Sequence, residues 1–415
     1  MLKQMELNNL LQKGDCFTRV GQLKRASRCY FLHAARSQPN RESLNKLAKS
    51  LVKQGRILES IDAYFMIAAK YPVALDNSIY FLREEVVSFL KEKPSLRDYI
   101  VKSLERIYTL SESANCLHTL SLIHLHIDRD LDKAINLNSR ASRERSRSLK
   151  KIRWENPEKY TLSSDRLPDF MVLGAPKCGT TALYGYLVKH PQILPPLTKE
   201  PQFFSKNDIY ERGLGYYKSF FPSFNDCTHL TFEASVAYLS SPIVPMRIKK
   251  ATPNIKLVFI LRNPAERAIS DYYMKLRIGQ EKRNLVDAMI PEIKFYEKSK
   301  KLDIKLDKNL SVEGRHRYVF KGIYYYHIQQ YMQLFDAKNI LFLNASDLKR
   351  NPQEVMDGIL GFLNLDSFSV NPMTRNVGKY SKEGSDYELV YEKLTSFYRY
   401  YNEKLRQTIG ISFGE

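Results

Sequence analysis

The chain has 415 residues, of which 43% are hydrophobic and 27% charged, so we expect two ordinary globular domains, and the composition does not indicate wholesale disorder. Its 65 basic and 45 acidic residues give a net charge of +20, which favours anionic partners such as nucleic acids, anionic lipids, phosphorylated cofactors or acidic glycans. The five scattered cysteines include no CxxC pair, and no stretch approaches the roughly 20 apolar residues of a membrane span. We therefore expect a cytoplasmic protein without a structural zinc site or a membrane span.

The N-terminal region contains a sequence repeat with a period of 34 residues. Arg19-Val20-Gly21-Gln22, Ala26 and Tyr30 recur as Lys53-Gln54-Gly55-Arg56, Ser60 and Tyr64. The tetratricopeptide repeat has this period. We therefore predict a tetratricopeptide-like α-helical repeat domain over residues 1–145, which could bind a protein partner. Generic helical hairpins with accidental spacing are the alternative.

Residues 146–168 are predicted to form a basic linker. They continue the Arg/Ser-rich run that begins near Ser139 and end at Leu167-Pro168. Such a run could contact nucleic acid or acidic lipid, but a solvated linker or an exposed helix face is the simpler interpretation. We therefore expect no nucleic-acid partner.

Residues 169–415 alternate short apolar runs with helical patterns. We predict strands over 170–173, 255–261 and 339–343, and helices over 180–189 and from Pro264 onward. Asn263 can cap the second helix, with Pro264 in its first turn. This alternation predicts an α/β domain with a parallel sheet flanked by helices.

A tight loop joins the first predicted strand to the following helix. Gly174 and Gly179 let the backbone approach an oxyanion closely, while Thr180, Thr181 and the helix N-terminus offer donors. Lys177 supplies a positive charge. In a Walker A loop the lysine directly follows the last glycine, whereas here it precedes Gly179. We therefore predict a P-loop-like phosphate-binding loop and disfavour a nucleoside triphosphatase, although simple strand-to-helix geometry is the alternative when the loop is taken alone. A transferring sulfuryl group carries less charge than a γ-phosphoryl group, so we expect no metal site.

Further motifs follow this loop in a fixed order: Lys199–Phe204, Gly213–Tyr217, Glu233–Leu239, Leu257–Tyr272, Gly322–Tyr324 and Asp347–Pro352. With them the chain resembles the sulfotransferases that use 3'-phosphoadenosine 5'-phosphosulfate (PAPS). The resemblance covers roughly residues 168 to 370. It is to the carbohydrate branch, which includes the heparan sulfate N- and 3-O-sulfotransferases.

The resemblance implies a set of cofactor-binding residues. The 5'-phosphosulfate would be held by the loop, and the 3'-phosphate by Arg262 and Ser270. Arg262 also ends a predicted strand, where α/β sheets bind ligands, and its guanidinium suits a bidentate phosphate contact. Without the surrounding motifs, a surface ion pair and a solvated serine would be the simpler interpretations of these two residues. The resemblance itself assigns Lys177, Gly179, Thr180 and Thr181 to the 5'-phosphosulfate, and we add Cys178 and Tyr324 to the predicted cofactor-binding residues. The cysteine pair and basic loop of the 3-O-sulfotransferases are absent here, and Arg375 and Lys379, which stand in their place, are predicted to close over the cofactor.

Two catalytic residues follow from the same resemblance. Glu200 corresponds to the catalytic glutamate of the heparan-type enzymes and would act as general base on the acceptor. Lys177 would stabilise the negative charge that develops on the leaving nucleotide during in-line displacement. Ala234 stands where several of those enzymes have a second lysine, so one of their catalytic cations is missing here.

The predicted function is transfer of a sulfuryl group from PAPS to a hydroxyl or amine of a carbohydrate or glycolipid. The sequence decides neither the acceptor nor O- versus N-sulfation. Alternatives are a tyrosylprotein sulfotransferase, a P-loop kinase, and a non-catalytic repeat scaffold with a relic nucleotide-binding domain. The basic segment from Lys275 to Lys321, interleaved with Phe295, Tyr296 and Tyr318, could contact an acidic glycan or form solvated faces.

Overall fold

A computed structural model describes residues 2–36, 41–70, 84–150, 166–222, 229–301, 317–372 and 383–413. The chain divides into two compact units. Unit 1 comprises Met1–Arg166, Pro195–Thr198 and Gly215–Asp226, and unit 2 comprises Leu167–Leu194, Lys199–Leu214 and Cys227–Glu415. Unit 1 thus includes two short segments from beyond the predicted linker, which itself lies mostly outside the described residues.

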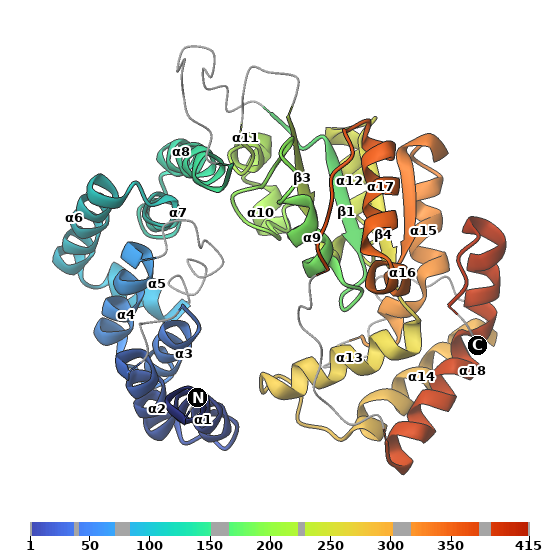
Figure 1. The fold of residues 1–415 in the computed structure, drawn as a ribbon, viewed down its shortest axis with the longest axis horizontal. Helices are drawn as coiled ribbons and strands as arrows, with labels where there is room; N and C mark the ends of the chain where they lie inside the picture. The colour runs from blue at the N-terminus through green and yellow to red at the C-terminus, as the bar shows by residue number, and fades with distance from the viewer. Residues whose placement is uncertain are drawn as a thin grey trace. The chain divides into compact units, whose positions relative to one another are not determined.

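Unit 1 is helical (Figure 1), which confirms the helical N-terminal region. The hairpins α1–α2 and α3–α4 turn at Gly21 and Gly55, 34 residues apart, and both glycines are left-handed, with φ of 75° and 72°. A left-handed turn of this kind favours glycine. The identity of the hairpins as tetratricopeptide repeats stays a prediction. The helices are α1 (Leu2–Arg19), α2 (Leu23–Arg36), α3 (Arg41–Val52), α4 (Ile57–Lys70), α5 (Glu84–Lys91), α6 (Pro94–Ser111), α7 (Ala114–Ile123), the π-helix η2 (His124–Asp128) and α8 (Leu131–Lys150).

A segment from the second half of the chain packs within unit 1. The hydroxyl of Ser142 on α8 donates to the carbonyl of Phe220 over 3.2 Å. The ring of His118 on α7 meets the Phe220 ring edge-on, with centroids 6.3 Å apart. These contacts explain why the described residues 215–222 group with the helices rather than with the sheet.

Unit 2 contains a parallel sheet of five strands in the order β2-β3-β1-β4-β5, which confirms the predicted sheet (Figure 1). The predicted strands are correct to within one residue at each end. The two strands on the β2–β3 side were not predicted, because β2 is very short and β3 has no long apolar run. The strands are β1 (Phe170–Gly174), β2 (Ile193–Leu194), β3 (Leu230–Ala234), β4 (Lys256–Leu261) and β5 (Ile340–Asn344).

Helices flank this sheet and also build a separate hydrophobic cluster. The described α- and 3₁₀-helices are α9 (Thr180–Leu187), α10 (Asn207–Tyr210), α11 (Gly213–Lys218), η4 (Val236–Tyr238), α12 (Val244–Ala251), α13 (Pro264–Arg277), α14 (Leu285–Lys301), η5 (Phe320–Gly322), α15 (Tyr324–Met332), η6 (Ala337–Asn339), α16 (Ala345–Arg350), α17 (Pro352–Leu363) and α18 (Ser385–Ile409). Helix α11 runs from unit 2 into unit 1.

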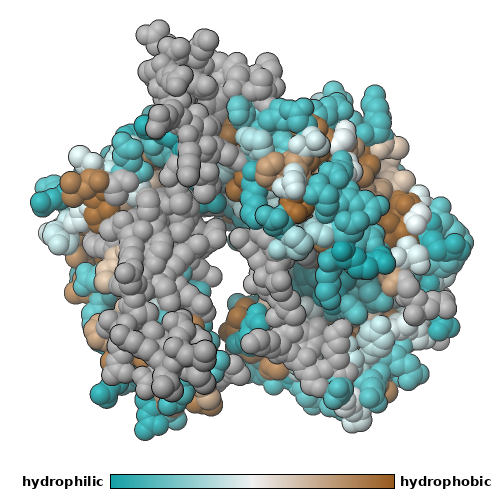
Figure 2. All heavy atoms as spheres, viewed as in Figure 1, coloured by the Kyte–Doolittle hydropathy of each residue, from teal (hydrophilic) through white to brown (hydrophobic). Residues whose placement is uncertain are grey.

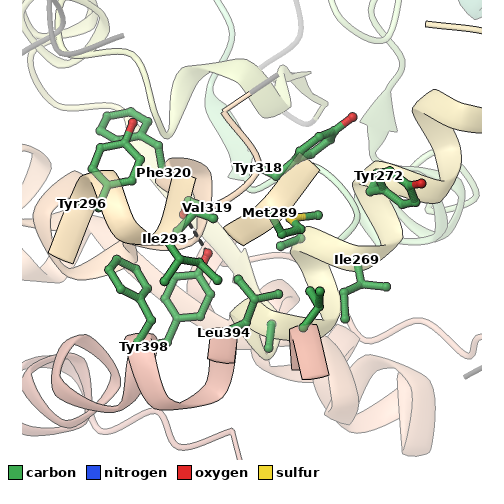
Figure 3. Packing of buried hydrophobic residues seen from close by; sticks show 14 of the residues in the cluster. Ile269, Tyr272, Met289, Ile293, Tyr296, Tyr318, Val319, Phe320, Leu394 and Tyr398 are labelled. Atoms are coloured by element: carbon green, nitrogen blue, oxygen red, sulfur yellow. Dashed lines mark hydrogen bonds between the residues drawn. The ribbon is translucent and has the colours of Figure 1, made fainter. Parts of the chain in front are cut away.

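The separate cluster joins α13, α14 and α18 with residues 318–323 (Figure 3). The hydroxyl of Tyr398 on α18 donates to the carbonyl of Val319 over 2.7 Å, as the dashed line shows. Tyr296 and Tyr318 lie buried in this cluster, and Phe295 packs against it. Tyr296 and Tyr318 are therefore core residues and do not belong to a glycan-binding surface, whereas Phe295 is only partly buried.

The face of unit 2 visible in Figure 2 is mainly hydrophilic, with hydrophobic side chains in small, separate groups. Within the described ranges, no helix combines the length and the apolar character needed to cross a membrane.

Candidate active site

The loop between β1 and α9 has an unusual backbone. Gly179 is left-handed, with φ of 89°, at the N-cap of α9, and Lys177 is left-handed too, with φ of 72°. A non-glycine residue rarely adopts this conformation, and such strain is concentrated at functional sites. The side chain of Cys178 is fully buried, and burial raises the pKa of its thiol. Cys178 therefore anchors the loop, while Lys177 and the start of α9 remain partly accessible.

Gly174 ends β1 and lies close to Thr180 and to Ile260 on β4. A β-carbon at this position would lie 2.5 Å from Cγ2 of Thr180 and 2.9 Å from Cγ2 of Ile260. These distances are too short for carbon atoms, so a larger residue would displace either the helix start or β4.

We expect Gly174→Ala to destabilise the protein by about 1–3 kcal/mol, because overpacking a close-packed site costs that much. It should also weaken nucleotide binding, since Thr180 belongs to the predicted binding loop. The measurements are thermal unfolding and titration with adenosine 3',5'-bisphosphate. Gly358→Ala on α17 is the control, because a β-carbon there meets nothing within 4 Å. Equal behaviour of the two variants would contradict the packing argument.

Arg262 follows β4, directly beside the loop. Because Gly174 pairs with Ile260 across the parallel strands, the segments after both strands leave the same edge of the sheet. Nη1 of Arg262 lies 3.5 Å from the carbonyl oxygen of Lys177. The hydroxyl of Tyr324 donates to the carbonyl of Arg262 over 3.0 Å and lies 3.6 Å from Sγ of Cys178. Tyr324 is buried, so it fixes the two segments to each other through these contacts.

The guanidinium of Arg262 is oriented by Glu266, one turn into α13. Nε and Nη2 of Arg262 donate to Oε2 of Glu266 over 3.0 and 2.6 Å. Asn263 caps this helix as predicted, because its Oδ1 accepts from the amides of Ala265 and Glu266. Ser270, which is buried on α13, follows Glu266 by one further turn. Arg262 thus lies just before α13, and Ser270 lies on this helix.

Sequence reasoning missed a buried charged cluster on α13. Asp271 accepts from Nη1 of Arg267 over 3.4 Å and from Nζ of Lys321 over 3.2 Å. Burial alone would raise the pKa of Asp271, but Lys321 and Arg267 outweigh that effect and hold it below its usual value. Burial lowers the pKa of Lys177, and the negative charge of Asp271 opposes this shift. Asp271 therefore partly balances the positive charge around the loop.

Glu200 lies on the segment that follows β2, and its side chain is 29% exposed. The ammonium group of Lys199 donates to Oε1 of Glu200 over 3.2 Å and to Oγ1 of Thr181 over 2.9 Å. Thr181 is in the first turn of α9. The structure therefore brings the predicted general base and the predicted phosphosulfate loop together through one lysine.

The end of β3 holds the Glu200 segment in place. The amide of Gln202 donates to Oγ of Ser235 over 3.3 Å, and this hydroxyl donates to the buried carboxylate of Glu233 over 2.5 Å. The amide of Phe204 donates to the hydroxyl of Tyr238 over 3.1 Å. The Glu233–Leu239 motif thus supports the Lys199–Phe204 motif, a relationship that the sequence order did not reveal.

Two predicted cofactor residues, Arg375 and Lys379, lie outside the described residues. In the described ranges, no group of three or more His, Cys, Asp or Glu side chains is arranged to hold a metal ion. The other predicted residues gather at the carboxyl edge of β1 and β4, on α13, at the start of α15 and on the Glu200 segment. This edge can offer a polyanionic ligand two cations, helix N–H groups and hydroxyl groups, beside a partly exposed carboxylate.

Comparison with known proteins identifies relatives of this region. The chain is 36% identical over 208 residues to the human bifunctional heparan sulfate N-deacetylase/N-sulfotransferase 3, which covers 48% of this chain and 22% of that protein. It is 29% identical over 219 residues to the type 1 enzyme of Caenorhabditis elegans, covering 51% and 24%. The chain thus spans about a quarter or less of the length of these relatives.

Among solved structures, the sulfotransferase from Alicyclobacillus acidocaldarius is 24% identical and has a TM-score of 0.47, with 60% of this chain and 97% of that chain covered. The model of the sulfotransferase domain family matches residues 167–384, which is more than half of the chain and includes every strand of the sheet and each described site residue. The chain belongs to the sulfotransferase domain family.

Proposed function

We propose that this chain transfers a sulfuryl group from PAPS to a hydroxyl or amine of a carbohydrate acceptor. The observation that supports the proposal most is that Lys177, Thr181, Glu200 and Arg262 lie together at one edge of the sheet. Family membership supports the reaction class, and the chemistry of these side chains supports the donor.

The residues of the site fit the proposed donor. PAPS carries anionic groups at both ends of one nucleoside. Lys177 and the start of α9 lie after β1 and would hold the phosphosulfate end, while Arg262 and Ser270 would hold the 3'-phosphate. A guanidinium has several N–H groups, so orientation of Arg262 by Glu266 is compatible with a phosphate contact. The buried hydroxyl of Tyr324 already contacts protein groups, so we assign it to support of the loop and not to the nucleotide.

Two side chains would perform the chemistry. Glu200 would accept the proton of the acceptor hydroxyl or amine while that atom forms its bond to sulfur. The bond from sulfur to the bridging oxygen of the donor breaks in the same displacement. Lys177 would stabilise the charge left on that oxygen, which needs a fixed cation but no covalent intermediate.

A carbohydrate acceptor is supported by the relatives, whose names describe N-sulfotransferases of heparan sulfate. Transfer to a glucosamine amine or to a sugar hydroxyl would use the same carboxylate base. A peptide tyrosine is the competing acceptor, since the helices of unit 1 could present a protein partner. Parallel assays with a de-N-sulfated heparan oligosaccharide and a tyrosine peptide separate these acceptors.

Arg262→Ala tests the proposed nucleotide site. Loss of a charge-assisted phosphate contact typically costs about 1.5–3 kcal/mol, so affinity for adenosine 3',5'-bisphosphate should fall by roughly ten-fold or more. Isothermal calorimetry without magnesium gives the affinity. Arg406→Ala is the matched control, because Arg406 also pairs with a nearby glutamate, Glu403, but on α18. Unchanged affinity in Arg262→Ala would refute the placement, and binding of magnesium-ATP instead would favour a kinase.

A further inference from the structure

The ammonium group of Lys199 occupies a junction between two parts of the site. It lies 2.9 Å from Oγ1 of Thr181 and 3.2 Å from Oε1 of Glu200. Its side chain is only 19% exposed, so water reaches it less than an ordinary surface lysine. An ammonium group offers several N–H donors and no acceptor, which lets it serve both oxygens together.

The contact with Thr181 links Lys199 to the loop that precedes α9. Lys199 and Glu200 are neighbours in sequence, so a bond between their side chains alone would leave both free to move with the segment. Thr181 belongs to α9, whose start is fixed by the left-handed Gly179 and by packing of Thr180 against Gly174. The contact with Thr181 fixes the ammonium group of Lys199 relative to the loop. The contact with Lys199 in turn fixes the carboxylate of Glu200 relative to the loop.

The segment around Glu200 has its other anchors further along the chain. Gln202 and Phe204 donate their amides to Ser235 and Tyr238, which fixes the backbone after Glu200. These bonds leave the direction of the Glu200 side chain open. Lys199 supplies the described contact that ties this carboxylate to the loop.

We propose that Lys199 is a positioning residue. It fixes the carboxylate of Glu200 relative to the donor-binding loop and affects the reaction through Glu200. The inference rests on the proposed function, because it assigns Lys199 a part in the same transfer. In-line displacement needs the donor sulfur, the acceptor atom and the base aligned, and a displacement of about 1 Å can cost about 10²-fold in rate.

The test is a double-mutant cycle of the full chain, with Lys199→Met, Glu200→Gln and the double variant. Single-turnover transfer from PAPS to a de-N-sulfated heparan oligosaccharide is measured at saturating donor. Lys199→Met should lower the rate by about 10- to 100-fold. In the Glu200→Gln background the same change should have less than about a two-fold effect, because a residue that acts through another is non-additive with it.

Binding and rescue measurements separate positioning from other roles. Affinity for adenosine 3',5'-bisphosphate should stay within about two-fold in Lys199→Met, and the melting temperature should stay within a few degrees. Lys199→Arg should recover most of the rate, since a guanidinium has several N–H donors that can reach both oxygens. Lys206→Met, which changes an exposed lysine of the same segment, should behave as the parent.

If the rate losses of the two single variants multiply in the double variant, the proposal is overturned. Lys199 would then act directly on the donor or the acceptor. A loss of nucleotide affinity as large as the loss of rate would overturn it too. A parent chain that neither binds the nucleotide nor transfers sulfuryl to any acceptor refutes the proposed function itself. That outcome is therefore distinguishable from failure of the Lys199 inference in an active enzyme.

Discussion

Replacing Lys177 with methionine should lower the rate of sulfuryl transfer by about 10²- to 10³-fold, the usual effect of removing one preorganised group that stabilises developing charge. Methionine keeps most of the length of the side chain but cannot balance the charge on the leaving oxygen. The left-handed backbone at this position should tolerate methionine no worse than lysine, because both have an unbranched β-carbon.

Single-turnover rates and nucleotide affinities of Lys177→Met and of Lys250→Met, an exposed lysine on α12, provide the comparison. The affinity of Lys177→Met for adenosine 3',5'-bisphosphate should fall by less than its rate does. Equal losses would mean that Lys177 only binds the nucleotide and does not act on the transition state.

The same lysine predicts how activity depends on pH. Burial lowers the pKa of Lys177, the carboxylate of Asp271 opposes this shift, and the charges of Arg277 and Arg262 add to it. The protonated form is the active one, so kcat/KM should decline on the alkaline side at a lower pH than an ordinary lysine would give. A bound anionic donor favours the charged form, so the alkaline decline of kcat should come at a higher pH. In Lys177→Arg this decline should disappear, because arginine stays protonated.

Local sequence signals predicted the elements that carry the site. β1, β4 and β5 are short apolar runs bounded by turns, and their predicted limits agree with the observed strands to within one residue. The cap at Asn263 was predicted because an asparagine directly precedes Pro264, and this pattern involves only a few residues. In such cases the residues that determine the structure are neighbours in the chain.

The missed features depend on residues far apart in the sequence. Asp271 and Lys321 meet only because α13 and η5 pack together, and neither position has a local pattern that indicates its partner. Likewise, Thr181 and Lys199 come from different elements. A single sequence does not show these pairings, so the contact of Lys199 with Thr181 and the effect of Asp271 on the pKa of Lys177 were found only in the folded structure.

Glu200→Gln should reduce turnover by about 10²- to 10⁴-fold, the range expected when a general base is lost. Glutamine has nearly the shape of glutamate, and its amide oxygen can still accept from Lys199, so the segment should keep its conformation. Affinity for adenosine 3',5'-bisphosphate should change little, since Arg262 and the loop hold the nucleotide in the proposed site.

Single-turnover transfer to the de-N-sulfated heparan oligosaccharide gives the rate, and calorimetry gives the affinity. Glu211→Gln is the matched control, because Glu211 is an exposed glutamate that follows α10 at the surface. A near-parental rate in Glu200→Gln would mean that another group removes the acceptor proton. A parallel loss of nucleotide affinity would instead make Glu200 part of the donor site. Only a loss of rate with affinity retained assigns the proton transfer to this carboxylate, because the base acts on the acceptor and not on the nucleotide.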